Sequence, residues 1–197
     1  MKKAFFLAFV AALTVSQVCI AAPSIPQGKY EIDPNHSSVA FEIPYLVIST
    51  VDGRFNNFTA SFEVDKKNQI SAKCDIDVAS VDTGIQKRDE HLRSPDFFDV
   101  TKFPKMTYVT KKVVWKDATN FTVVGDLTMH GVTKEVLLTA KYLGSVKDMQ
   151  SKQRAAITAT GTLNRRDFGL VQNMMVESGQ VIGDQVTLIF KLQAVKL

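Results

Sequence analysis

Apolar and polar residues alternate with a period of two along most of the chain, and this pattern constrains the fold more than any other feature of the sequence. Between Phe58 and Val64, for example, every second residue is apolar and its neighbours are polar. This is the period of a β-strand with one buried face. The pattern recurs in about eight segments, which we expect to be strands: 39–43, 58–64, 72–78, 106–115, 121–129, 132–143, 155–163 and 186–195.

Turn sequences such as Lys66-Lys67-Asn68 and Met129-His130-Gly131 separate neighbouring segments. Short links of this kind require antiparallel pairing. A sheet of about eight strands has two exposed edges unless it closes on itself, and closure removes both. A barrel of about eight strands has room inside for packed side chains or for one small ligand. We therefore expect an all-β fold, an eight-stranded antiparallel β-barrel, without a second domain.

Residues 79–100 interrupt the strand pattern with a dense cluster of charges and adjacent phenylalanines. A loop of roughly 20 residues inside a compact domain is unusual and is commonly either functional or disordered. Ile85, Leu92 and Phe98 give this segment too much apolar surface for disorder. We predict a short helical insertion, two helical pieces that lay aromatic side chains over one end of the β-structure. Asp82 is expected to cap the turn that follows it.

Several segments, in their order and spacing, resemble the YceI-like family of bacterial periplasmic proteins over nearly all of the chain after residue 21. One departure is Tyr45, where the family usually has histidine. The resemblance implies an elongated, lipocalin-like barrel that carries a long apolar molecule, usually a polyisoprenoid. The segments that carry it are Tyr30-Glu31-Ile32-Asp33-Pro34-Asn35-His36-Ser37-Ser38-Val39-Ala40-Phe41, Ser49-Thr50-Val51-Asp52-Gly53-Arg54-Phe55, 80–100, 125–134, 163–169 and 182–195.

The N-terminus has the features of a secretory signal peptide. It has a positively charged start at Lys2, an apolar core over 4–18 and small residues up to Ala21, after which we expect cleavage. The apolar core is shorter than the roughly 20 residues needed to span a bilayer. The sequence therefore predicts a signal peptide at 1–21, a YceI-like β-barrel domain at 22–197, and a periplasmic location without stable membrane insertion.

The charge distribution argues against a nucleic-acid partner. The formal net charge is +4, and basic pairs such as Lys111-Lys112 are scattered among acidic residues, which is typical of a solvated surface. Cys74 is the only cysteine after the expected cleavage site, so no internal disulfide can form. It is in phase with apolar neighbours, which indicates a buried thiol. An intermolecular disulfide and a homodimer stay open as alternatives.

The sequence favours no catalytic or metal centre. His36, His91 and His130 lie in three different segments, and their spacing fits none of the local metal-binding patterns. A nucleophile elbow of the G-x-S-x-G type is also missing. We therefore expect a protein that is not an enzyme and uses no metal or cofactor. An esterase or isomerase acting on lipids is the less favoured alternative.

Phenylalanine is abundant, with 13 residues against four tyrosines and one tryptophan. Inward-facing aromatic residues, together with two apolar stretches outside the strands, indicate a lined cavity. We expect a carrier of a long apolar amphiphile, a polyisoprenoid or an isoprenoid quinone, with a fatty acid or fatty amide as the alternative. For Arg166 two interpretations remain, a structural salt bridge that pins the helical insertion to the barrel or a contact with a polar head group. The candidate ligand-binding residues are Phe41, Phe58, Phe62, His91, Phe97, Phe98, Tyr108, Arg166, Phe168, Met174 and Met175.

Overall fold

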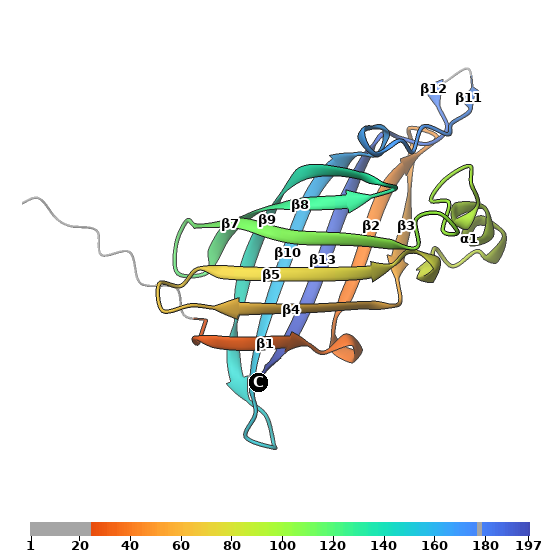
Figure 1. Ribbon diagram of the computed structural model, residues 1–197. Helices are drawn as coiled ribbons and strands as arrows, with labels where there is room; N and C mark the ends of the chain where they lie inside the picture. Colours follow the sequence, from red (N-terminus) through yellow and green to blue (C-terminus); the bar gives the residue numbers. More distant parts are fainter. Residues whose placement is uncertain (1–24, 177–178) are drawn as a thin grey trace, which may run out of the picture.

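The computed structural model describes residues 25–176 and 179–197 (Figure 1). The expected signal peptide lies outside the described residues and stays a prediction. Within the described residues, no helix is long and apolar enough to cross a membrane. The elements are β1 (Gly28–Ile32), η1 (Pro34–His36), β2 (Ser38–Tyr45), β3 (Ser49–Phe55), β4 (Phe58–Val64), β5 (Ile70–Asp77), η2 (Val78–Ser80), β6 (Val81–Asp82), α1 (Gln86–Arg93), β7 (Lys105–Trp115), β8 (Asn120–Met129), β9 (Val132–Lys147), β10 (Gln153–Asn164), η3 (Arg165–Phe168), β11 (Met175–Val176), β12 (Gly179–Gln180) and β13 (Gln185–Lys196).

Antiparallel strands close into a barrel in the order β1-β4-β5-β7-β8-β9-β10-β13, because β1 pairs with both β4 and β13. Tyr30 of β1 lies opposite Phe62 on one side and Lys196 on the other. The predicted all-β, eight-stranded antiparallel barrel is confirmed, and all of the alternating segments are strands. The strand that closes the ring, however, is β1, which was not among the expected segments. Its five residues are too few for alternation to identify them.

The barrel divides at one end because β1 and β2 diverge. The turn η1 separates them, and both pair with β13: Ile32 lies opposite Ala194, whereas Phe41 lies opposite Leu188. From there β1 joins β4, whereas β2 continues the sheet outward through β3 to β6. The strands β2, β3 and β6 therefore form a flap beside the mouth of the barrel rather than part of the closed ring.

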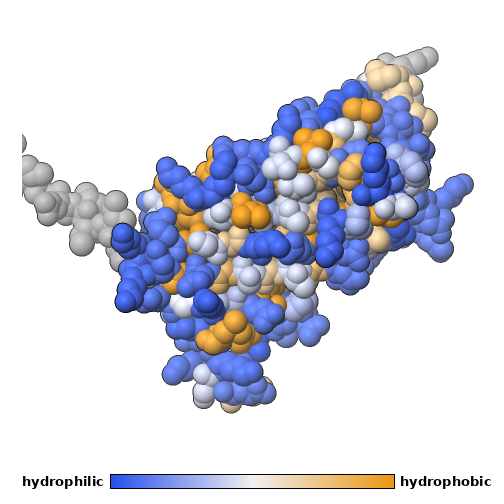
Figure 2. Space-filling model, viewed as in Figure 1, coloured by the Kyte–Doolittle hydropathy of each residue, from blue (hydrophilic) through white to orange (hydrophobic). Residues whose placement is uncertain are grey.

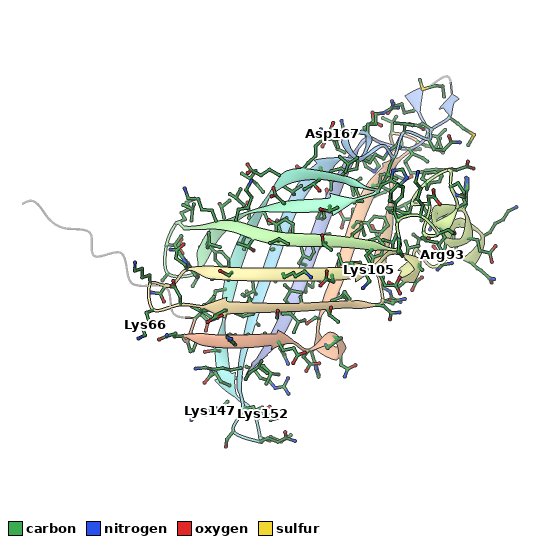
Figure 3. All side chains as sticks on the ribbon, in the orientation of Figure 1. Lys66, Arg93, Lys105, Lys147, Lys152 and Asp167 are labelled. Carbon is green, nitrogen blue, oxygen red and sulfur yellow. The ribbon has the colours of Figure 1, made fainter. Side chains whose placement is uncertain are left out.

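The two ends of the barrel differ in how they are filled. At the end away from α1, the Trp115 and Phe121 rings lie 4.4 Å apart, and the indole donates to the Asn68 carbonyl at 3.0 Å. Tyr30 stacks on Phe62 with ring centroids 4.6 Å apart. At the opposite end α1 covers the barrel; Figure 3 labels Lys66 at the first end and Arg93, the last residue of α1, at the second. Large aromatic side chains therefore fill one end of the barrel. A ligand-binding site can form at the other end, which α1 covers.

The expected helices are partly confirmed. The insertion contains one α-helix, α1, and its second part forms turns instead of a second helical piece. Near Met174 the chain is extended, because Met175 begins β11, which pairs with β12. The 3-10 helix of this region lies earlier in the chain, at η3.

Candidate ligand-binding cavity

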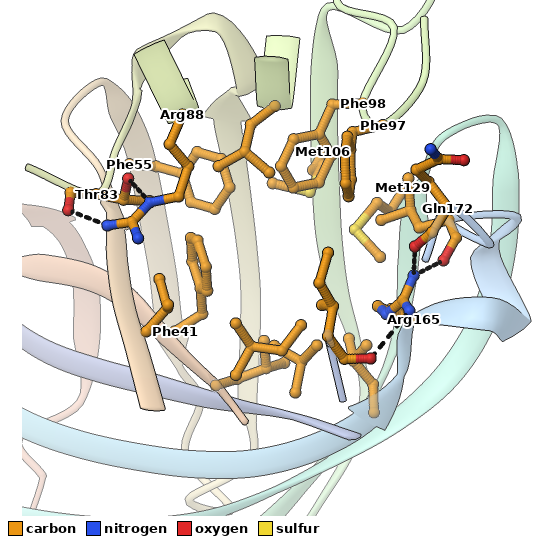
Figure 4. Close-up of a pocket in the computed structure, with 18 of the residues that line it drawn as sticks. Phe41, Phe55, Thr83, Arg88, Phe97, Phe98, Met106, Met129, Arg165 and Gln172 are labelled. Carbon is orange, nitrogen blue, oxygen red and sulfur yellow. Dashed lines mark hydrogen bonds between the residues drawn. The ribbon is translucent and has the colours of Figure 1, made fainter. Parts of the chain in front are cut away.

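A cavity of about 370 Å³ lies at the end of the barrel that α1 covers (Figure 4). This volume is within the range of small-molecule sites, about 300–1,000 Å³. Strands of the closed ring, the flap, α1 and the segment after η3 all contribute to its wall. The apolar lining includes Val39, Phe41, Ile43, Phe55, Phe98, Met106, Leu127, Met129, Leu163, Val186, Leu188 and Phe190.

The alternation of β2 and β13, together with Gly53, positions the phenylalanine side chains in the wall of this cavity. Successive inward positions of β2 carry Val39 and Phe41, and β13 contributes Phe190 in the same way. Gly53 lies opposite Phe41 in the β2–β3 ladder, and a Cβ atom there would lie 2.2 Å from Phe41 Cζ. The Phe55 ring centroid lies 5.7 Å from that of Phe41. The missing side chain at Gly53 therefore leaves room for the Phe41 ring beside the cavity.

The start of the insertion is fixed by Asp82. Its Oδ1 accepts the N–H of Gly84 at 2.9 Å, which confirms the predicted turn cap. Its Oδ2 accepts from Arg54 Nη2 at 2.9 Å and from Asn56 Nδ2 at 3.2 Å. The Gly84 N–H, followed by Arg54 and Asn56, lowers the pKa of Asp82 to about 2. Asp82 thus links the flap to the insertion as a carboxylate at neutral pH.

The C-terminal end of α1 is held by Arg93. Its Nε and Nη2 donate to the carbonyls of Ala79 and Val81 at 2.7 and 2.6 Å. The turns that follow bring the Phe98 ring to 5.9 Å from the Phe55 ring, edge to face. The insertion therefore lays an aromatic side chain over the barrel end, as the sequence predicts.

A buried arginine holds the opposite wall. Arg165 is 3% exposed, and its guanidinium donates to the carbonyls of Leu170, of Gln172 at 2.9 Å and of Gly183, the last from Nε at 2.8 Å. Asp184 supplies a carboxylate oxygen 3.2 Å from Nη2. Burial lowers the pKa of Arg165 below its ordinary value. One cation thus organises the segment between η3 and β13, and it also lines the cavity.

Arg166, the arginine singled out from the sequence, has a different setting. Its Nε donates to Asp184 Oδ1 at 2.7 Å, and its side chain is 40% exposed. It is not among the described residues that line the cavity. Arg166 therefore forms a structural salt bridge, but its partner is Asp184, before β13, and not a residue of the helical insertion.

Polar groups from α1 gather at the mouth. Arg88 donates to Thr83, from Nε to Oγ1 at 2.7 Å and from Nη2 to the carbonyl at 2.8 Å. Asp89 is buried and accepts from the Thr83 N–H at 2.9 Å and from its hydroxyl at 2.6 Å. Arg88, Thr83 and His91 line the cavity (Figure 4 labels the first two). The mouth therefore presents hydrogen-bond donors next to an apolar interior.

The three histidines serve separate turns. His36 Nδ1 lies 2.9 Å from Asp33 Oδ2, His91 Nε2 lies 3.3 Å from Asp96 Oδ2, and His130 Nδ1 lies 3.1 Å from the Phe168 carbonyl. Among the residues that the structure describes, no group of three or more His, Cys, Asp or Glu side chains is placed to hold a metal ion.

A second, smaller cavity of about 100 Å³ lies deeper in the barrel. Phe62, Tyr108 and Cys74 line it, and Phe190 lines both cavities. The Tyr108 hydroxyl donates to the Val136 carbonyl at 3.1 Å. Burial, with a smaller contribution from the charge of Asp75, raises the pKa of the Cys74 thiol to about 12. Cys74 therefore faces the interior, as its phase in β5 predicts.

The structure brings some of the candidate residues together and separates others. Five of them line the main cavity: Phe41, His91, Phe97, Phe98 and Met174. Phe62 and Tyr108 line the second cavity. Phe58, Arg166, Phe168 and Met175 are not among the described residues that line either one, and Phe168 is fully packed in the core. Contact of any of these residues with a ligand stays a prediction.

Sequence reasoning missed several lining residues, among them Phe55, Met129, Arg165 and Phe190. For two of them a signal was present. Arg165 is in phase with Leu163, an inward position of β10, and Phe190 is in phase with Leu188 on β13. Alternation continued to the end of each strand would have marked both as inward-facing.

The comparison with known domains identifies the family. The profile of the YceI-like domain matches residues 30–194. The chain belongs to the YceI-like family. A UPF0312 protein of Yersinia enterocolitica is 38% identical over 173 residues, covering 86% of this chain and 90% of that protein. The matched region contains the whole closed barrel apart from the first residues of β1 and the last residues of β13.

Solved structures share the fold of this YceI-like chain. BcnA of Burkholderia cenocepacia superposes with a TM-score of 0.73 at 22% identity, over 82% of this chain and 98% of that one. A domain from Saccharophagus degradans, described as a polyisoprenoid binding domain implicated in plant cell wall breakdown, superposes with a TM-score of 0.63 at 18% identity. That match covers 85% of this chain and 98% of the domain. Tyr45 lines the main cavity.

Proposed function

We propose that the protein is a periplasmic carrier that sequesters a long apolar amphiphile, a polyisoprenoid or an isoprenoid quinone, and transfers it without making or breaking bonds. The observation that carries the proposal is the apolar cavity of about 370 Å³ at the covered end of the barrel. The description of the Saccharophagus degradans domain supports the ligand class. The signal-like N-terminus supports export.

The energetics of an isoprenoid tail fit such a site. Each buried CH₂ group contributes about 0.8 kcal/mol, so one five-carbon unit contributes on the order of 4 kcal/mol. A tail of several units therefore has almost no free concentration in water, and crossing an aqueous compartment requires a protein that encloses it. The wall of phenylalanine, leucine and methionine side chains supplies that enclosure.

The mouth is suited to a polar head with acceptor atoms. Arg88 lines the cavity and donates to neutral oxygens of Thr83. Among the ion pairs formed by the described residues, none involves Arg88. A carbonyl, phosphate or carboxylate oxygen would accept from its remaining N–H groups. We therefore expect the head near α1 and the tail inside the barrel.

A fatty acid or fatty amide is the second candidate, and the size of the site favours it. The main cavity lies near the lower end of the range for ligand pockets. Phe190 lines both cavities, and we expect a long tail to displace its ring on the way to the second one. A single tail of moderate length would fill the main cavity without that movement.

Native mass spectrometry of freshly purified protein, followed by lipid extraction, tests the proposal. A bound mass that fragments in five-carbon steps would identify a polyisoprenoid, whereas a saturated tail would support the second candidate. Recovery of the lipid in unchanged form after prolonged incubation separates a carrier from an esterase or isomerase. Protein without co-purified lipid, with a barrel that its own side chains fill, would refute the carrier function.

A further inference from the structure

We propose that the rim of the cavity mouth docks on a lipid bilayer, so that the ligand passes directly between membrane and barrel. The rim consists of two tips. The first is the β2–β3 turn with Val47 and Ile48, and the second is the segment after η3 with Val171, Met174 and Met175. The inference rests on the proposed carrier function for the identity of the cargo, but the docking surface is defined by its own side chains.

Large apolar side chains are exposed at both tips. Ile48 is 90% exposed, Val47 68% and Met175 71%. In Figure 2 pale orange, hydrophobic atoms lie at the end of the molecule where Figure 1 places β11, in contrast to the mostly hydrophilic surface beside them. Exposed apolar groups that gather at one place mark interaction sites for proteins or membranes.

The two tips lie side by side at the cavity. The Leu46 N–H donates to the Val181 carbonyl at 2.8 Å, and Tyr45 pairs with Ile182 across an isolated bridge. Tyr45, Ile182 and Met174 also line the cavity. A bilayer in contact with the tips would therefore face the opening through which an apolar tail must pass.

The charge pattern of the first tip favours a bilayer over a polar partner. Segment 43–51 contains no Asp, Glu, Lys or Arg, although charged residues make up 22% of the chain. In the second tip, residues 168–176 also lack charge, and Glu177 follows them in the sequence between β11 and β12. Transfer of an unpaired charge into an apolar phase is costly, so an inserting tip must lack charges. Tyr45 stands at the base of the first tip, and tyrosine is enriched where a membrane meets water.

The backbone of the first tip supports a role outside folding. Leu46 and Val47 have φ angles of 51° and 66°, in the left-handed region. Hairpin turns with two such residues favour Asn and Gly, and a β-branched residue is strongly disfavoured there. Val47 is exposed, so it does not contribute to the core either. Contact with an apolar partner explains an apolar residue at this position.

Flotation of the mature protein with pure phosphatidylcholine vesicles tests the inference. The wild type should float with the vesicles, and added salt should not release it, because the proposed contact is made by the apolar side chains of the tips. The double variant Val47→Asn with Ile48→Ser should partition into the vesicles at least roughly tenfold more weakly than the wild type. Asn suits a left-handed φ better than Val, so this variant is expected to remain folded.

The matched control is the β9–β10 turn, where Val146 and Met149 are also exposed but Lys147, Asp148 and Lys152 surround them (Figure 3 labels the two lysines). Val146→Asn with Met149→Ser should float like the wild type. Equal flotation of both double variants, or no flotation of the wild type, would overturn the inference. Light scattering that shows a dimer for the wild type and a monomer for the Val47→Asn, Ile48→Ser variant would also overturn it, because a second copy would then cover the tips.

Two measurements on the same samples test the docking surface and the carrier function separately. Flotation reports membrane binding, and mass spectrometry reports lipid retention in solution. Protein that retains lipid but does not float would defeat the docking surface and leave the carrier function intact. Protein that floats but never retains lipid would defeat the carrier function and leave the docking surface.

Discussion

Replacement of Arg165 by methionine should destabilise the protein by about 3–5 kcal/mol, the range for removing one partner of a buried charged pair. The guanidinium donates to the carbonyls of Leu170, Gln172 and Gly183. A hydrogen bond from a charged donor contributes about 1.5–3 kcal/mol, so these bonds amount nominally to roughly 5–9 kcal/mol. The net loss of stability is smaller than this sum for two reasons. Water can hydrogen-bond to the carbonyls that lose Arg165, and the variant no longer buries a charged group.

Urea denaturation of the two arginine variants measures this effect. Arg166→Met is the matched control, because its partly exposed ion pair with Asp184 should contribute no more than about 1 kcal/mol. Hydrogen exchange should show faster exchange over 169–184 in Arg165→Met, since the wall of the cavity loses its anchor. An Arg165→Met variant that is less than about 1 kcal/mol destabilised, with unchanged exchange over this segment, would refute the reasoning.

Three further predictions follow from single residues. Phe190→Ala should join the two cavities and shift the co-purified ligand to longer tails in native mass spectrometry; an unchanged tail length would show that Phe190 sets no limit. Because the pKa of Cys74 is raised to about 12, iodoacetamide at pH 8 should modify it slowly in the folded protein and rapidly in urea. The pKa of Asp82 is lowered to about 2. Its contribution to stability should therefore be present above the unfolded value of about 3.9 and be lost as the pH falls towards 2, and Asp82→Asn should remove this part of the acid dependence of the melting temperature.

The strands could be predicted because alternation is a local property of the sequence. β4, for example, has the bounds expected from its pattern, Phe58–Val64. The sequence could not show that β1 closes the barrel. Closure requires one short segment to pair with both β4 and β13, and this depends on the register between strands far apart in the sequence. The divergence of β1 and β2 at η1 is equally non-local, so alternation predicted β2 as a strand but not its place in the flap outside the closed ring.

The site was only partly predictable for a different reason. Phe41 and Phe58 are both inward-facing aromatic residues, but one lines the cavity and the other packs in the core. The difference depends on what lies opposite, such as Gly53 beneath the Phe41 ring. Arg165 and Arg166 are adjacent in sequence, and only the strand phase distinguishes the buried cation from the exposed one.

The central claim is that an apolar ligand occupies the barrel, and native mass spectrometry of Phe41→Asp tests it most directly. An unpaired charge in the cavity wall is costly next to an apolar tail. Leu137→Asp is the matched control, because Leu137 is 56% exposed on the outer face of β9. The wild type and Leu137→Asp should carry the co-purified lipid, whereas Phe41→Asp, with an unchanged circular dichroism spectrum, should not. A folded Phe41→Asp protein that retains the lipid at wild-type occupancy would contradict the account.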